Sequence, residues 1–230
     1  MQGNQTNHSF YQAKKMLEGD VYQKDKQRTT LYCEARFNVN KQIRFPEGFT
    51  TSKYKKRAKK VEWEHVVPAE NFGRHFKAWR EGDKHCVTSK GKAYKGRRGA
   101  EKTNQNYRLM QADMYNLYPA IGAVNAKRSN YNFVMLKGDK NSFARCAMKI
   151  SNRKAEPPKN TRGMIARSYL YMHESYKRYS MSHQQHQLMS AWNKQFSVTP
   201  WECLRAQRIA KLQGNESAIL VKNCTLAGFN

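Results

Sequence analysis

The chain has 230 residues, and its 43 lysines and arginines against 17 aspartates and glutamates give a formal net charge of +26. Its 39% hydrophobic content is typical of a soluble globular chain, and no apolar run approaches the roughly 20 residues that cross a bilayer, which excludes a membrane-spanning protein. A positive surplus this large indicates a polyanionic partner, such as nucleic acid, an anionic membrane or an acidic glycan.

Short helix and strand signals fill the first half of the chain. Residues 9–17, SFYQAKKML, predict a short amphipathic helix within an N-terminal arm that extends to residue 28. Two segments rich in β-branched and aromatic residues, 29–39 and 60–67, predict strands. No charged and then apolar signal peptide is visible at the start of the sequence.

The middle of the chain begins with a Gly- and Lys-rich segment, 80–102, that predicts an exposed loop. A helical pattern follows in 103–116. In 117–130, LYPAIGAVNAKRSN, we expect Pro119 to lie in the first turn of a helix, where the missing N–H is tolerated.

The C-terminal third is strongly helical in pattern. Apolar residues recur at helical spacing from Ile165 to Tyr176, Ser182 with Gln185 forms a possible capping box, and a helix beginning near Thr199 should end near Gly214. Neither an internal repeat nor a linker is visible. We therefore expect one α+β domain over 1–230, with an arm in 1–28, a strand-rich part in 29–130 and a mainly helical part in 131–230.

The stretch 61-VEWEHVVPA-69 places Glu62, Glu64 and His65 inside an apolar strand. Alternation puts both carboxylates on one face, and His65 on the other unless the strand ends there, as Pro68 suggests. One carboxylate and one further oxygen donor can hold Mg²⁺ while a neutral imidazole takes a proton from an attacking water. By spacing alone, a structural Glu–His hydrogen bond is the commoner explanation.

Two other functions remain open at this point. Glu62 and Glu64 could be the acid pair of a glycoside hydrolase acting on acidic cell-wall polymer, which leaves His65 unexplained. A non-catalytic, basic nucleic-acid-binding protein would need no such constellation.

Five cysteines, Cys33, Cys86, Cys146, Cys203 and Cys224, contain no CxxC pair, which argues against a zinc ribbon. The odd number indicates two disulfides and one free thiol in an exported protein, or five thiols in a cytosolic one. Composition leaves both possibilities open.

A set of collinear motifs resembles the bacterial endonuclease I family of secreted or periplasmic nonspecific nucleases. They run from about Tyr32 to Cys224 and include VEWEHVVPAENFG, DMYNLYPAIGAVNAKRSN, RGMIARSYLYM, AWNKQF, TPWEC and RIAKLQGN. The resemblance implies a mixed fold around a ββα-metal core and cleavage of DNA and RNA to 5′-phosphate ends. It also implies a monomer, one Mg²⁺ per site (a site that Mn²⁺ or Ca²⁺ can occupy) and a buried chloride.

By the same resemblance, His65 is the general base, Glu64 a metal ligand and Asn125 the second protein ligand. Glu62 would orient the site, although a solvated strand carboxylate explains it equally well. The family has an arginine in its Gly-rich loop that stabilises the cleaved phosphate, and here the nearest cation in 79-WREGDKHC-86 is Lys84.

Further phosphate contacts are expected from Lys127 and Arg128, which follow the presumed metal ligand closely. For the cysteines, the resemblance implies disulfides Cys33–Cys146 and Cys203–Cys224. It leaves Cys86 as a free thiol, because Ala78 stands where the family often has its partner.

The charge predicts how such an enzyme would respond to salt. Each phosphate contact steepens the loss of affinity with salt, so a chain of charge +26 should bind DNA very tightly at low salt. Because product release would then limit turnover, we expect maximal activity at several times the ~0.15 M physiological level of salt.

Overall fold

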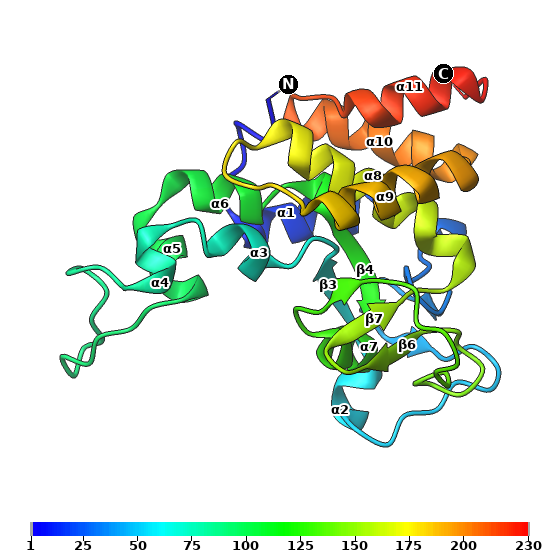
Figure 1. Ribbon diagram of the computed structural model, residues 1–230, viewed down its shortest axis with the longest axis horizontal. Coiled ribbons are helices and arrows are strands. Elements are labelled where there is room, and N and C mark those ends of the chain that lie inside the picture. Colours follow the sequence, from blue (N-terminus) through cyan, green and yellow to red (C-terminus); the bar gives the residue numbers. More distant parts are fainter. Residues whose placement is uncertain (1, 230) are drawn as a thin grey trace.

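The computed structural model describes residues 2–229, which form a mixed α+β fold (Figure 1). Helices α8–α11 gather at one end, and a central pair of strands, β3 and β4, runs from them toward a small sheet at the other end. The α-helices are α1 (Phe10–Met16), α2 (Lys55–Ala58), α3 (Ala69–Gly73), α4 (Lys77–Arg80), α5 (Arg97–Thr103), α6 (Gln105–Gln111), α7 (Gly122–Arg128), α8 (Arg162–Ser175), α9 (His183–Gln195), α10 (Pro200–Gln213) and α11 (Ala218–Leu226). Short helices of other pitch are η1 (Leu17–Val21), η2 (Asp25–Gln27), η3 (Met114–Asn116) and η4 (Lys159–Thr161).

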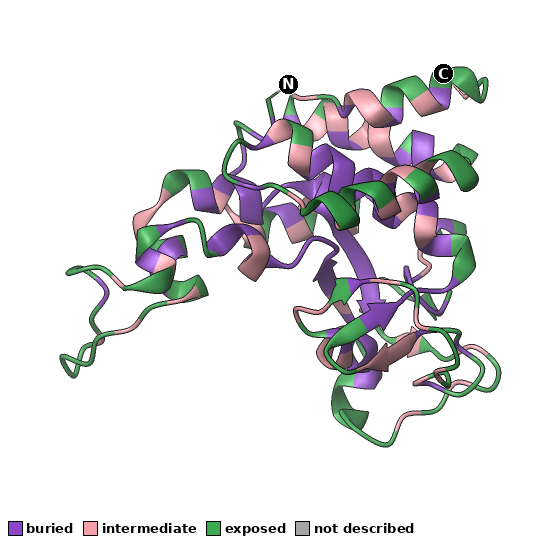
Figure 2. Ribbon diagram, in the orientation of Figure 1, coloured by how far each residue is buried: buried purple, intermediate pink, exposed green. Residues whose placement is uncertain are grey.

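The strands form three small sheets: β1 (Arg36–Phe37) with β2 (Ile43–Arg44), β3 (Val61–His65) with β4 (Leu117–Ile121), and β5 (Asn132–Phe133), β7 (Lys154–Glu156) and β6 (Lys149–Ser151) in that order. Strands β3 and β4 are antiparallel, and α7 follows β4 directly and packs against both strands. They form a ββα unit whose strands lie buried in the middle of the molecule (Figure 2). The unit fixes the positions of β3 and α7 relative to each other.

The first half of the chain confirms some predicted elements and corrects others. Helix α1 begins after Ser9, whose side chain accepts a hydrogen bond from the backbone N–H of Gln12, and β3 ends at His65. The predicted strand over 29–39 is wrong for most of its length, since only Arg36–Phe37 is a strand. Glu34 adopts a positive φ of 53°, which interrupts extended backbone.

The prediction for Pro119 is also wrong, because residues 117–121 form strand β4 and the helix begins only at Gly122. All five residues of β4 are buried, as the unbroken apolar run requires. Pro119 pairs opposite Trp63 in β3, and its carbonyl accepts a hydrogen bond from the backbone N–H of Leu31 at 2.8 Å. A strand with one neighbour tolerates a residue that donates no ladder hydrogen bond.

The helices of the C-terminal third are confirmed with their N-caps, but the capping box is not closed, because the side chain of Gln185 donates to the carbonyl of Phe133 at 3.3 Å. Ser182 accepts from the N–H of Gln185 at 3.2 Å, and Thr199 accepts from the N–H of Glu202 at 3.1 Å. Gly214 ends α10 in the left-handed conformation, with φ of 77°. None of the helices described over 2–229 has the length and apolarity that crossing a membrane requires.

Two disulfides join distant segments, Cys33–Cys146 and Cys203–Cys224. Cys86 is buried and unbridged. These pairs agree with those that the family resemblance implies. The first bond spans 113 residues of sequence and ties the segment before β1 to the loop before β6.

Candidate active site

His65 lies at the end of β3 with its ring enclosed. Its Nε2 is 2.8 Å from the backbone carbonyl oxygen of Gln111, and its ring centroid is 4.9 Å from that of Phe10. Because a carbonyl can only accept, Nε2 carries the hydrogen and Nδ1 is the basic nitrogen. Burial, reinforced by the positive charge of Arg97, lowers the pKa of His65 to about 3, so the imidazole is neutral at physiological pH.

Glu64 precedes His65 and is almost completely buried. Two donors reach the same oxygen, Oε1: the hydroxyl of Tyr32 at 2.8 Å and Nη1 of Arg128, which also forms a buried ion pair with Glu64. Burial raises the pKa of Glu64, and the charge of Arg128 and the hydrogen bond from Tyr32 oppose that rise. Among the described residues no hydrogen bond reaches Oε2 of Glu64, which therefore remains a carboxylate oxygen with free lone pairs.

Asn125, on α7, is oriented by a hydrogen bond. Its Nδ2 donates to Oε2 of Glu62 at 2.8 Å, and Arg57 donates to the same carboxylate through Nε at 2.7 Å and through Nη2. With Nδ2 engaged, Oδ1 of Asn125 points away from Glu62 and accepts no hydrogen bond within the described part of the chain. Glu62 therefore orients an amide oxygen.

Glu64, His65 and Asn125 line one pocket of about 380 Å³, together with Arg57 and Arg97. We call it the catalytic pocket. A neighbouring pocket of about 420 Å³ shares Arg57, Arg97 and Asn125 with it and extends along α1 past Lys14 and Lys15. Because they share lining residues, the two pockets adjoin and form one cleft. Its walls carry the cations Lys14, Lys15, Lys41, Arg57 and Arg97 beside the carboxylates of Glu18, Glu62, Glu64 and Glu70.

The structure brings Arg97 to the catalytic pocket and leaves Lys84 outside it. Lys84 lies in the exposed segment between α4 and α5 and lines neither pocket of the cleft. The predicted loop over 80–102 in fact ends where α5 begins at Arg97. Arg97 is not among the site residues predicted from the sequence. The doublet Arg97-Arg98 after Gly96 resembles the rest of the basic segment, so the sequence alone does not distinguish it from a loop.

The two expected phosphate contacts on α7 are also placed differently. Arg128 is 0% exposed, and its guanidinium donates to Glu64 and to the carbonyls of His65 at 2.8 Å and Val66 at 2.6 Å. A phosphate on the surface cannot reach it, and its role here is to hold the end of β3. Lys127 lies over the ring of Phe143 at 5.3 Å and lines neither pocket of the cleft.

The donor set fits a hard divalent cation. No cluster of three His, Cys, Asp or Glu side chains of the kind that holds Zn²⁺ occurs in residues 2–229. Glu64 and Asn125 instead line the catalytic pocket, each with one oxygen that makes no hydrogen bond among the described residues, and Mg²⁺ is commonly held by one or two such oxygens and several waters. The implied chloride also has a suitable donor, since Nη1 of the fully buried Arg205 has no hydrogen-bond partner among the described residues.

Comparison with known proteins identifies the family. The family described as Endonuclease I matches residues 2–222. An extracellular deoxyribonuclease of Aeromonas hydrophila is 38% identical over 202 residues, which cover 85% of this chain and 82% of that protein. A periplasmic deoxyribonuclease of the same species is 37% identical, over 85% of this chain and 79% of that protein. Endonuclease-1 of Buchnera aphidicola subsp. Acyrthosiphon pisum (strain APS) is 37% identical, over 77% of this chain and 66% of that protein. The chain therefore belongs to the endonuclease I family.

Proposed function

We propose that this chain is a metal-dependent, sequence-nonspecific endonuclease that hydrolyses phosphodiester bonds of DNA, double- or single-stranded, and of RNA, leaving 5′-phosphate ends. One observation carries the proposal: His65, Glu64 and Asn125 line one pocket, and among the described residues Nδ1 of His65, Oε2 of Glu64 and Oδ1 of Asn125 make no hydrogen bond. By analogy with relatives named extracellular and periplasmic deoxyribonucleases, it acts as a secreted or periplasmic enzyme.

His65 is suited to act as the general base. The carbonyl of Gln111 holds Nε2–H, so Nδ1 can accept a proton from a water molecule that attacks the phosphorus. Packing against Phe10 and burial keep the ring neutral and fixed in orientation. The proton accepted at Nδ1 produces an imidazolium, which the carbonyl of Gln111 stabilises through the Nε2–H bond.

Glu64 and Asn125 would hold Mg²⁺ through Oε2 and Oδ1. When bound, the ion supplies positive charge that stabilises the phosphorane-like transition state and the departing 3′-oxygen. Glu62 keeps Oδ1 of Asn125 facing that position, because its carboxylate engages the amide nitrogen. Arg57 in turn holds the Glu62 carboxylate with two hydrogen bonds.

The cationic wall of the cleft would bind the phosphate backbone. Arg97 is exposed and lines both pockets. Its guanidinium can therefore donate hydrogen bonds to the scissile phosphate or to an adjacent one. Lys14 and Lys15 extend this wall along α1. Because phosphate contacts carry no sequence information, such a cleft favours nonspecific cleavage.

A plasmid assay with four arms tests the proposal. Supercoiled DNA is incubated with wild type or His65→Ala, each in Mg²⁺ and in EDTA, and nicked and linear products are quantified. We expect nicking only by wild type with Mg²⁺, and a loss of at least about 100-fold in His65→Ala. Metal-independent nicking would reject the proposal, as would a gel shift with DNA that stays intact in all arms.

A further inference from the structure

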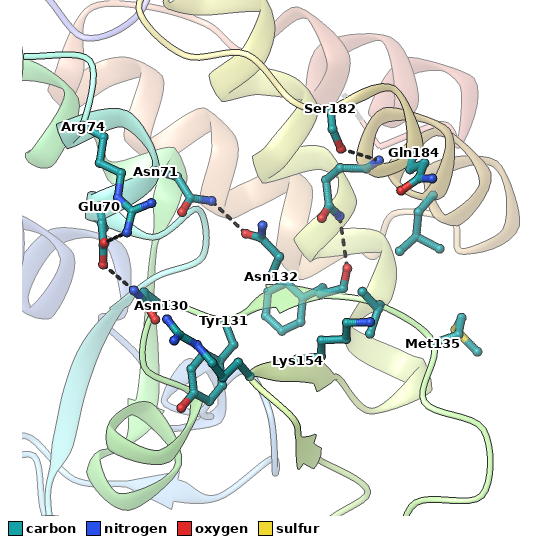
Figure 3. Close-up of a pocket in the computed structure, with 15 residues that line it drawn as sticks. Glu70, Asn71, Arg74, Asn130, Tyr131, Asn132, Met135, Lys154, Ser182 and Gln184 are labelled. Atoms are coloured by element: carbon teal, nitrogen blue, oxygen red, sulfur yellow. Dashed lines mark hydrogen bonds and ion pairs between the residues drawn. The ribbon is translucent and has the colours of Figure 1, made fainter.

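A recess outside the cleft lies next to the catalytic pocket. It has a volume of about 510 Å³ and lies between α3, the segment through β5, the β6–β7 turn and the start of α9 (Figure 3). We call it the side recess. Glu70 and Asn130 line both the side recess and the catalytic pocket, so the two spaces share a wall. A nucleic-acid strand that leaves the catalytic pocket across this wall enters the side recess.

The shared wall does not repel a phosphate strand. Glu70 is its carboxylate, and both of its oxygens are engaged: Arg74 donates to Oε1 and Asn130 donates to Oε2 (Figure 3). The ion pair with Arg74 neutralises the charge of Glu70. Arg153 and Lys154 add two exposed cations to the lining, so the side recess is positively charged as a whole.

Amide side chains offer free hydrogen-bonding groups inside the side recess. Nδ2 of Asn71 donates to Oδ1 of Asn132 at 2.8 Å (Figure 3). This pairing leaves one acceptor, Oδ1 of Asn71, and one donor, Nδ2 of Asn132, with no partner among the described residues. An adjacent donor and acceptor match the edges of nucleobases, which present the same groups side by side. Tyr131 and the 54%-exposed Met135 provide nonpolar surface for the face of a base.

The β6–β7 turn carries a cation at a strained position. Asn152 and Arg153 form a two-residue hairpin turn in which both φ angles are positive, 47° and 58°. Turns of this kind favour Asn-Gly, because a side chain at the second position is strained in the left-handed region. Arginine at this position brings a guanidinium to the side recess at a cost to the backbone, a pattern typical of binding residues.

We propose that the side recess is a subsite for one unpaired nucleotide that flanks the scissile phosphate. The Asn71–Asn132 pair receives the base edge, and Arg153 and Lys154 receive its phosphate. The nucleotide has to be unpaired, because Tyr131 and Met135 can cover the face of a base only when that base is not stacked within a duplex. The subsite rests on the proposed nuclease function and adds to it a preference for single strands or frayed ends.

Mapping of cut positions tests the subsite directly. End-labelled single-stranded oligonucleotides, each with one abasic residue at a different position, are digested with wild type and with Asn132→Trp, which fills the side recess from an exposed strand position. When wild type cuts one particular bond near the abasic residue, that residue lies in the side recess. We expect cutting at this bond to be about tenfold slower than at the same bond of the unmodified strand. In Asn132→Trp this position dependence should disappear, while the unmodified strand is still cut in a metal-dependent way.

A second variant separates binding from folding. Arg153→Gly creates the preferred Asn-Gly turn, so its melting temperature should equal or exceed that of wild type. Its affinity for single-stranded DNA, measured by fluorescence anisotropy in EDTA, should fall about tenfold. Lys211→Ala, which removes an exposed charge from α10, is the matched control and should change the affinity much less.

The outcomes distinguish the subsite from the nuclease proposal. Equal abasic effects at all positions in wild type, or an unchanged affinity in Arg153→Gly, would overturn the subsite while metal-dependent cutting of the unmodified strand still supports the nuclease. If wild type fails to cut the unmodified strand at all, both proposals are rejected.

Discussion

At the scale of single residues, the site depends on side chains whose two polar atoms have different environments. In His65 one nitrogen is engaged by Gln111, in Glu64 one oxygen is engaged by Tyr32 and Arg128, and in Asn125 the nitrogen is engaged by Glu62. In each case the second atom makes no hydrogen bond among the described residues, and the residue lines the catalytic pocket. Burial makes this arrangement stable, because an engaged atom that lost its partner would carry the full cost of desolvation.

The buried imidazole predicts how stability depends on pH. The pKa of His65 falls from 6.5 in the unfolded chain to about 3 in the folded protein. Between these values the unfolded state binds one more proton, so the free energy of unfolding falls as pH decreases, by up to ~1.4 kcal/mol per pH unit. Above pH 6.5 the imidazole is neutral in both states and contributes no pH dependence.

Urea unfolding in EDTA between about pH 6 and pH 4 measures this contribution. We expect the free energy of unfolding to fall more steeply with acid for wild type than for His65→Asn. Parallel curves for the two proteins would show that the ring titrates normally in the folded state.

Substitution of Glu62 tests whether it positions Asn125. In Glu62→Gln the charge that holds Arg57 is lost, and a single acceptor oxygen remains for both Arg57 and Asn125. The amide of Asn125 is then held less firmly, so we expect kcat to fall about 10- to 100-fold, as for other residues that orient ligands. Glu47→Gln removes the carboxylate of an exposed ion pair with Arg145 and is the matched control. An unchanged kcat in Glu62→Gln, with wild-type melting temperature, would mean that Glu62 is only a solvated strand carboxylate.

At the scale of elements, the site requires a close approach of α7 to α2. A Cβ atom on Gly122 would lie 2.4 Å from the backbone oxygen of Arg57 and 2.8 Å from Oε1 of Glu62. We expect Gly122→Ala to lower the free energy of unfolding by about 1–3 kcal/mol through overpacking and to displace Glu62 from Asn125. Both thermal unfolding and kcat should therefore be affected.

Gly19→Ala is the control for this substitution, since no atom outside its own helix and its chain neighbours lies within 4 Å of the added Cβ. It should change stability by no more than about 1 kcal/mol and leave kcat unchanged. Equal stability and activity in the two alanine variants would contradict the close approach that α7 makes.

Elements with strong local signals were predictable from the sequence. The caps at Ser182 and Thr199 and the stop at Gly214 located the C-terminal helices, because these signals act within a few residues. The prediction that Pro119 lies in the first turn of a helix is wrong. The preference of proline for that position is outweighed by the pairing of β4 with β3, a contact between segments more than fifty residues apart. The segment 29–39 has strand composition, yet it is held by isolated hydrogen bonds such as that from Leu31 to Pro119.

In the site, too, some features follow from sequence motifs and others depend on contacts between distant segments. The motif residues Glu64, His65 and Asn125 share a pocket, as the family resemblance implies. The sequence could not show that Arg128 is buried beneath β3, because a basic residue after a presumed ligand suits a solvated phosphate contact equally well. Nor could it show that α5 begins at Arg97 and brings that residue, and not Lys84, to the catalytic pocket.

At the scale of the whole molecule, the formal charge of +26 dominates the expected interaction with DNA. The logarithm of the association constant for duplex DNA should fall linearly with the logarithm of the salt concentration, with a slope of about −0.9 per phosphate contact. We therefore predict that kcat rises with NaCl and reaches a maximum at several times ~0.15 M, as product release becomes faster. Steady-state rates across a salt series test this, and a monotonic fall in rate from about 0.05 M upward would contradict it.

The most direct test of the whole account is whether Asn125 is a ligand of the bound ion. Calorimetric titration of Mn²⁺ into wild type, His65→Ala, Asn125→Ala and Asn125→Asp measures this without any reaction. We predict one ion with similar affinity in wild type and His65→Ala, at least about tenfold weaker binding in Asn125→Ala, and retained binding in Asn125→Asp, which keeps an oxygen donor. Wild-type affinity in a folded Asn125→Ala protein would contradict the account, because the ion would then be held elsewhere.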